Sequence, residues 1–223
     1  MENEQEFYAE RSRSKFLNRV YFNLLLAIIA FVGIEIFFFS TGIAMQITQA
    51  VQGSWLMIMG AFMVVGWLAT RMAHSATNIV TQYMALGGYV VANAIITAPM
   101  LVIAASSYPG AIANASYVTI AGFITLTIVV LITGKDFSFL RSIMVWGGFC
   151  ALGAIVASII FGAELGTWFS VLMVAFAGGA ILFDTSNVLH HYPEDKAVGA
   201  SLQLFASVAL LFWYVLRLFM SRD

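Results

Sequence analysis

The stretch GGAILFDTSNVLHH, residues 178–191, places a carboxyl group, Asp184, inside an otherwise apolar run. A charged side chain in the middle of a membrane span costs about 2.5–3.5 kcal/mol on insertion scales, and less near an interface. Acids in spans are therefore rare, and by default they are functional candidates with polar partners. Asp184 is the first candidate for chemistry in this chain, as a group that exchanges a proton or attracts a cation.

The neighbours of Asp184 on a helix are small or polar. At helical spacing, Ala177 and Ala180 lie two turns and one turn before it, and Asn187 lies one turn after it. This face is expected to meet other helices rather than lipid. Arg71, at the inner end of an earlier apolar segment, is the basic residue expected at a similar depth and is a candidate partner.

A second polar stripe runs through the last apolar segment, at Gln203, Ser207 and Tyr214. If this segment packs beside the one that carries Asp184, Ser207 comes close to the carboxyl group. The alternatives are that Asp184 anchors the inner end of its helix, and that the stripe only makes hydrogen bonds between helices. The residues to which we assign a pH-sensing or ion-sensing role are Asp184, Ser207, Arg71 and Asn187.

Other titratable residues give weaker signals. Glu35 lies in the outer part of the first apolar segment, where it either reaches the interface or faces the bundle. Glu164 is expected in a solvated loop. His190 and His191 are adjacent and point in different directions, so metal ligation would need more ligands than the two acids of "YPED" offer. The sequence predicts interfacial roles for both histidines, and no metal or cofactor.

Several function classes lack the residues they require. A retinal protein needs a lysine in the middle of a span, but Lys15, Lys135 and Lys196 all lie outside the apolar segments. A rhomboid-like serine protease needs an intramembrane histidine and a Gly-x-Ser-Gly turn, and the sequence has neither. No phosphate-binding loop is present, and no basic patch suits nucleic acid. We therefore expect no enzyme and no nucleic-acid partner.

Composition indicates what must position these residues. Of 223 residues, 61% are hydrophobic and 9% are charged, whereas soluble domains carry about 25% charged residues. Because a span needs about 20 apolar residues, the sequence predicts an all-α membrane protein with seven transmembrane helices in a compact bundle. The predicted spans are 20–41, 54–72, 79–98, 111–133, 139–162, 167–190 and 198–220. Residues 1–18 are predicted to be a disordered cytoplasmic tail, and 19–223 the transmembrane domain.

Orientation follows from the lysines and arginines beside the spans, which favour the cytoplasmic side. With the N-terminus in the cytoplasm, the outer side receives only Arg217 and Arg222. The inner side receives Arg11, Arg13, Lys15, Arg19, Arg71, Lys135, Arg141 and Lys196. A cytoplasmic N-terminus is therefore predicted. If one segment is re-entrant, the C-terminus moves to the cytoplasm as well.

Three motifs resemble one family. "LNRVYFNLLLA" (17–27), "GKDFSFL" (134–140) and "ILFDTSNVLHH" (181–191) resemble the first span, the loop before the fifth span and the acidic sixth span of the Bax inhibitor-1 family, also called TMBIM or lifeguard proteins. Their order and spacing fit nearly the whole chain. Within the family, "AILFDTSN" and the C-terminal "SRD" look most like the bacterial YccA branch.

The resemblance implies a fold in which six spans surround a central one. In members described as pH-sensitive calcium leaks, acids on the sixth and seventh spans share a proton and close a pore, and an arginine of the second span tunes it. Asp184 matches the first acid, whereas Ser207 stands in place of the second, and Ala69 or Arg71 falls near the arginine. Because serine cannot share a proton as a carboxylate does, the substitution favours the YccA branch.

The YccA branch is known for modulating the membrane AAA protease FtsH. The resemblance therefore implies a non-enzymatic protein of the bacterial inner membrane, embedded in lipid, that binds such a protease. The N-terminal tail would be the handle that the protease grips, or it would only orient the first span. The alternative function is a pH-sensitive leak for calcium or another cation, gated around Asp184.

Overall fold

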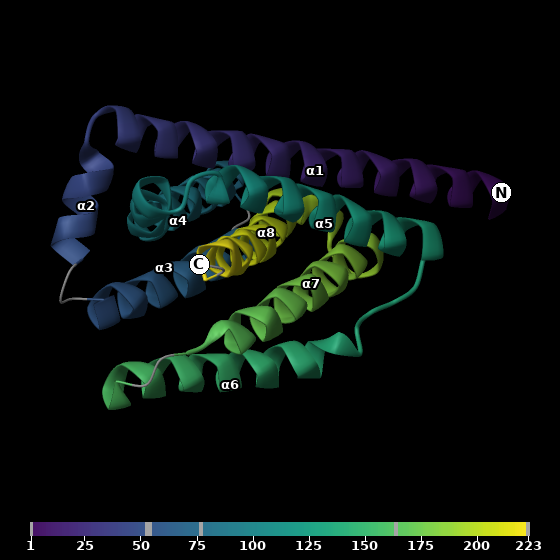
Figure 1. Ribbon diagram of the computed structural model, residues 1–223. Helices are drawn as coiled ribbons and strands as arrows, with labels where there is room; N and C mark the ends of the chain where they lie inside the picture. The colour runs from purple at the N-terminus through teal and green to yellow at the C-terminus, as the bar shows by residue number, and fades with distance from the viewer. Residues whose placement is uncertain (1, 52–54, 76–77, 163–164, 222–223) are drawn as a thin grey trace.

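The computed structural model describes residues 2–51, 55–75, 78–162 and 165–221, without the side chains of 2–10, 55–59, 74 and 75 (Figure 1). Within these ranges the chain is helical, with short turns between the helices. The helices are α1 (Glu2–Ser40), α2 (Ile43–Val51), α3 (Trp55–Ser75), α4 (Ile79–Ser107), α5 (Ala111–Thr133), α6 (Leu140–Phe161), α7 (Thr167–His190), the 3₁₀ turn η1 (Glu194–Lys196) and α8 (Ala197–Met220).

Six helices are long and apolar enough to cross a membrane, namely α1, α4, α5, α6, α7 and α8. The predicted all-helical membrane protein is therefore confirmed. The remaining predicted span coincides with α3, whose described part carries a shorter apolar helix at Gly60–Ala73. The count of seven spans and the cytoplasmic N-terminus stay predictions.

The segment between the first two predicted spans, which was expected to be a loop, contains a helix, α2. Its apolar residues Ile43, Ile47 and Val51 recur every four positions, and Gln46 and Gln49 fall between them. One face of α2 can therefore pack on α1 and α4, which it contacts, while the glutamines stay polar. Nine residues are too few to cross a bilayer, so α2 connects two spans.

The first helix begins earlier than the sequence indicated. Where residues 1–18 were expected to be disordered, α1 begins at Glu2, and it extends past the neighbouring helices at its N-terminal end (Figure 1). Phe16 is only 2% exposed and stacks on Tyr192, with 6.5 Å between ring centroids. Because Phe16 packs on the bundle, the ordered part of α1 includes residues before the predicted start of the transmembrane domain at residue 19.

The last helix occupies the middle of the bundle. α8 contacts α1, α3, α4, α5 and α7, and it is nearly surrounded by them in Figure 1. Two buried clusters lie against it, one around Val20 and Leu202, and one around Ile181 and Leu211. α6 lies at the edge beside α7 and has no buried residue.

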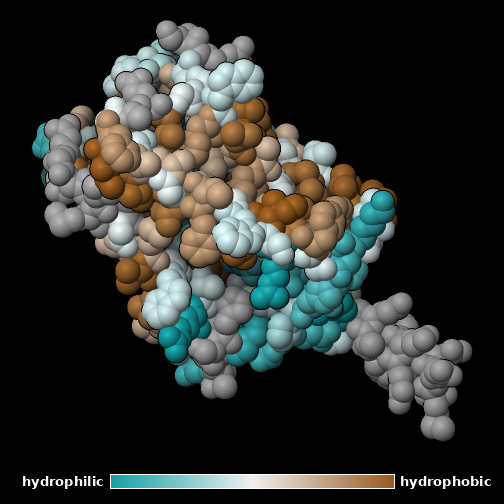
Figure 2. All heavy atoms as spheres, turned by 90° about the horizontal axis from the view of Figure 1, so that it is seen from below, coloured by the Kyte–Doolittle hydropathy of each residue, from teal (hydrophilic) through white to brown (hydrophobic). Residues whose placement is uncertain are grey.

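The outer surface is apolar, as lipid requires. Phe161 and Trp168 are 80% and 82% exposed, a condition that water would penalise and hydrocarbon would not. In Figure 2 hydrophobic side chains cover most of the face in view, and hydrophilic ones gather along one side of it. This distribution fits a protein whose flanks lie in the bilayer.

Candidate functional site

Asp184 lies in the interface between α7 and α8, and it is 5% exposed. The Ser207 hydroxyl donates a hydrogen bond to its Oδ2, and Nε2 of Gln203 donates one to its Oδ1 at 2.6 Å. Both donors lie on one face of α8, because residues four apart are neighbours on a helix. The sequence placed Gln203 in the polar stripe but did not single it out as a site residue.

The pair Asp184 and Ser207 has the chemistry of a carboxyl group with a hydroxyl donor. Hydrogen bonds to an ionised acceptor are about twice as strong as neutral ones, so the two α8 donors fix the carboxyl group in place. The effect of its charge reaches Tyr192, which lies beyond the end of α7. Burial of this phenol raises its pKa, and the Asp184 carboxylate raises it further.

The contacts described for the two other predicted site residues are with other groups. The backbone carbonyl of Asn187 accepts hydrogen bonds from the amides of His191 and Tyr192, at 2.8 and 2.9 Å, and these bonds close the last turn of α7. The exposed Arg71 guanidinium lies over the Trp67 ring, 5.3 Å from its centroid. The hydrogen bonds described for Asp184 come from α8 instead.

The end of α7 is joined to α1 by Arg13, which the sequence analysis did not single out. Its guanidinium donates to the carbonyls of Val188, Leu189 and Tyr192, at 2.7, 3.1 and 2.7 Å. The last carbonyls of a helix have no partner within the helix, and a cation there also favours the helix dipole. Arg13 thus caps α7 from a point about 175 residues earlier in the chain.

The loop before α6 is attached to the same end of α7. Ser186 Oγ accepts a hydrogen bond from the amide of Phe137 at 2.8 Å, and His191 Nε2 lies 2.8 Å from Oδ2 of Asp136. The other oxygen of Asp136 accepts from the amide of Ser138 at 2.8 Å. The hydrogen bond from His191, and next the one from Ser138, lower the pKa of Asp136 to about 2. Two of the motifs that suggested the family, "GKDFSFL" and "ILFDTSNVLHH", therefore lie in contact.

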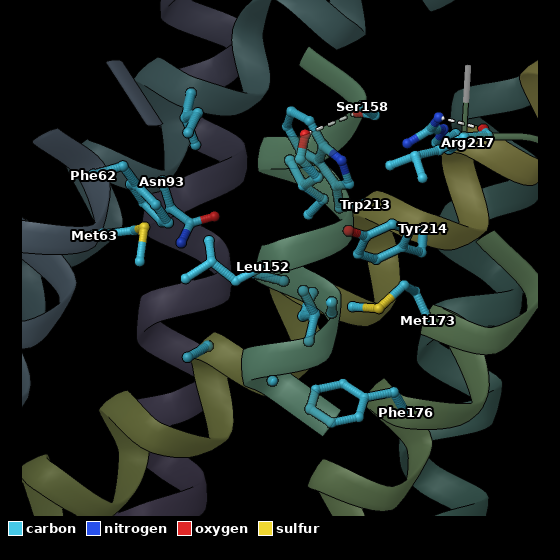
Figure 3. Close-up of a pocket in the computed structure, with 18 of the residues that line it drawn as sticks. Phe62, Met63, Asn93, Leu152, Ser158, Met173, Phe176, Trp213, Tyr214 and Arg217 are labelled. Carbon is cyan, nitrogen blue, oxygen red and sulfur yellow. Dashed lines mark hydrogen bonds between the residues drawn. The ribbon is translucent and has the colours of Figure 1, made fainter. Parts of the chain in front are cut away.

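A cavity of about 760 Å³ opens between α3, α4, α6, α7 and α8 (Figure 3). Trp213, Tyr214 and Arg217 line one part of it, and Arg217 donates to the carbonyl of Leu165 at 2.9 Å. The cavity reaches Phe176 on α7, and Asp184 is not among its lining residues. Eight residues separate Phe176 from Asp184, which is about 12 Å along a helix.

The two other acids of the apolar segments have different outcomes. Glu35 is 6% exposed, so it faces the bundle rather than the interface. Glu164 lies outside the described residues. No group of three or more acids, histidines or cysteines is placed to hold a metal ion in the part of the chain that the structure describes.

Comparison with known proteins identifies relatives of this arrangement. Residues 13–223 match the family described as "Inhibitor of apoptosis-promoting Bax1". A protein of Pseudomonas aeruginosa, PA2604, is 34% identical over 111 residues, which are 48% of this chain and about half, 49%, of that protein. The "Modulator of FtsH protease YccA" of Escherichia coli K12 is 29% identical over 165 residues, 70% of this chain and 71% of YccA. The "Inner membrane protein YccA" of Escherichia coli O6:H1 has the same identity and coverage.

Proposed function

This chain belongs to the Bax inhibitor-1 family, as its motifs predicted, and from that premise we propose that it binds and modulates a membrane AAA protease of the FtsH type. It would act as a non-enzymatic, multi-pass protein of the bacterial inner membrane. The observation that carries the proposal is the similarity to YccA, a named modulator of FtsH, over 70% of this chain.

The packing at the N-terminal end supports this role. A protease that threads its substrates must grip a chain end and pull on the folded part behind it. Pulling on the start of α1 loads the three hydrogen bonds from Arg13 to the end of α7 and the stacking of Phe16 on Tyr192. These contacts join the first helix to the bundle, so the bundle resists extraction. A resistant substrate occupies the protease and thereby lowers its turnover of other substrates.

The experiment is affinity purification of the tagged full chain from a bacterial membrane, with detection of FtsH, and measurement of the half-life of another FtsH substrate when the chain is in excess. We expect co-purification and a longer half-life. Deletion of residues 2–10 should abolish both effects, because it shortens the handle and leaves Arg13 in place. A chain that neither co-purifies with FtsH nor lengthens the half-life would contradict the proposal.

A second candidate function is a cation leak gated at Asp184. What favours it is the position of Asp184, buried between two spans and about 12 Å beyond the end of the cavity in Figure 3. A gate at this point would separate the cavity from the opposite side of the membrane. Calcium flux into liposomes from about pH 6 to 8 tests it, with Asp184→Asn expected to remove the pH dependence. Absence of flux in both proteins would reject the leak and leave the protease proposal intact.

A further inference from the structure

A second cavity, of about 730 Å³, lies between α1, α4, α5 and α8, and Asp184 is not among its lining residues. Its size is that of a small-molecule site, which spans about 300–1,000 Å³. Most of its wall is aliphatic or aromatic, with Phe31, Leu101, Phe205 and Phe212 among the lining residues. An apolar wall of this kind accommodates a hydrocarbon chain.

The wall also contains a carboxyl group that its surroundings do not satisfy. Glu35 lines the cavity and is 6% exposed, and both of its carboxyl oxygens are buried without a hydrogen-bond partner among the described residues. The hydroxyl of Thr119, across the cavity on α5, is buried in the same condition. Unsatisfied buried polar groups are costly and call for an explanation. Two in one cavity indicate that a ligand with hydrogen-bond donors completes it.

The position of Glu35 suits a group that enters from the membrane. Glu35 lies five residues before the end of α1 at Ser40, about 7.5 Å along the helix. Ser40 and Ile112 both line the cavity, so it begins near the last residue of α1 and the first residues of α5, and it extends inward to Ile28. Ile36 in its wall is 64% exposed on the lipid-facing surface, which gives lateral access from one leaflet.

We propose that this cavity binds a cationic amphiphile, with one ammonium head on Glu35 and an apolar tail along α1 and α8. An ammonium group has three donors and no acceptor, which matches one carboxylate and one hydroxyl oxygen. An anionic head would be repelled by Glu35, and a head without donors would leave both groups unsatisfied. This site is independent of the protease proposal, because it involves neither Arg13 nor Asp184.

The test is saturable binding of radiolabelled dodecylamine to the full chain in phosphatidylcholine nanodiscs, with empty nanodiscs as the background. A primary amine keeps its proton at neutral pH, as lysine does. Unlabelled dodecylamine should compete, and dodecanol, of equal chain length but uncharged and with a single donor, should compete much more weakly. Glu35→Gln should weaken binding by about 10- to 100-fold, the usual effect of losing a hydrogen bond to a charged group. Thr119→Val should weaken it by about 2- to 10-fold.

The matched control is Glu194→Gln, which removes one carboxylate from η1, near the end of α7 and outside the residues that line the cavity. It should bind dodecylamine as the parent does. Equal competition by dodecanol, or unchanged binding by Glu35→Gln, would show an apolar cavity only and overturn the proposal. Absence of saturable binding to the parent would overturn it as well. If Glu35→Gln does not fold, the comparison of amine with alcohol on the parent and the Thr119→Val variant decide the question.

Discussion

Replacing Arg13 with alanine should loosen the contact between α1 and the end of α7. The guanidinium donates three hydrogen bonds, of 2.7 to 3.1 Å, to the carbonyls of Val188, Leu189 and Tyr192. It also lies 4.8 Å from the centroid of the Phe16 ring, in cation–π geometry. Alanine removes all of these contacts and leaves the last carbonyls of α7 without this cap.

The magnitude depends on the number and kind of bonds. A hydrogen bond to a charged group contributes about 1.5–3 kcal/mol net, and a cation at a helix C-terminus about 0.3–1 kcal/mol. Because one half-buried guanidinium makes all three bonds, their contributions do not add in full. We expect a loss of about 2–4 kcal/mol. For a chain of this length that loss lowers the melting temperature by about 4–16 °C.

The assay is thermal melting of the purified protein in detergent, together with the rate of tryptic cleavage after Lys196, which lies just beyond the contact in the chain. Arg13→Ala should melt earlier and be cut faster. The matched control is Arg11→Ala, because Arg11 is an exposed arginine two residues away on the same helix. If the two variants melt and are cut alike, Arg13 does not hold α1 to α7, and the proposed resistance of the bundle to pulling loses its basis.

Four further substitutions test other contacts. Ser207→Ala should lower the free energy of unfolding by about 1–3 kcal/mol, because the buried Asp184 loses a hydrogen-bond donor. Asp184→Asn keeps an acceptor for Gln203 and should lower it by less. Unfolding by SDS titration compares the two variants. Asp136 has a lowered pKa of about 2, so its contact with His191 stabilises the protein above about pH 4 and is lost as the pH falls toward 2. Asp136→Asn should therefore flatten the dependence of melting temperature on pH in that window, and an unchanged slope would contradict this. Gly199→Ala should lower the free energy of unfolding by about 1–3 kcal/mol, measured by thermal melting, because the added methyl group lies 3.2 Å from the carbonyl oxygen of Ala73. A variant as stable as the parent would show that α8 can move away from α3 at this point without cost.

The spans were predictable because hydrophobicity is a local property of about 20 residues. The predicted ranges 111–133 and 167–190 match α5 and α7 residue for residue. The region of Asp184 was also predictable, since an acid in an apolar run stands out, and helical spacing placed Ser207 on a polar stripe. Whether two stripes meet depends on which helices are neighbours, and this information is not local.

The features that the sequence analysis missed depend on contacts between distant parts of the chain. In the sequence Arg13 is one of several positive charges before the first span. It caps α7 only because the fold brings the last carbonyls of α7 within hydrogen-bond distance of it. The sequence allowed two locations for the Glu35 side chain, the interface and the bundle, because a helical wheel does not show which neighbouring helix covers each face. The helix α2 was missed because its glutamines suggested a polar loop. Only the four-residue spacing of Ile43 and Ile47 indicates an amphipathic helix.

The position of α8 has a consequence for biosynthesis. The helix at the centre of the bundle follows the other described helices in the chain, so the ribosome makes it after them. Ser201 within it donates to the carbonyl of Val20, 181 residues earlier. Until α8 is inserted, the first helices have no central partner, and the polar groups of α1 and α7 that face it remain without their final donors. The bundle therefore closes around α8 only after the other described helices have been made, and a chain that stops before α8 lacks the helix on which both buried clusters pack.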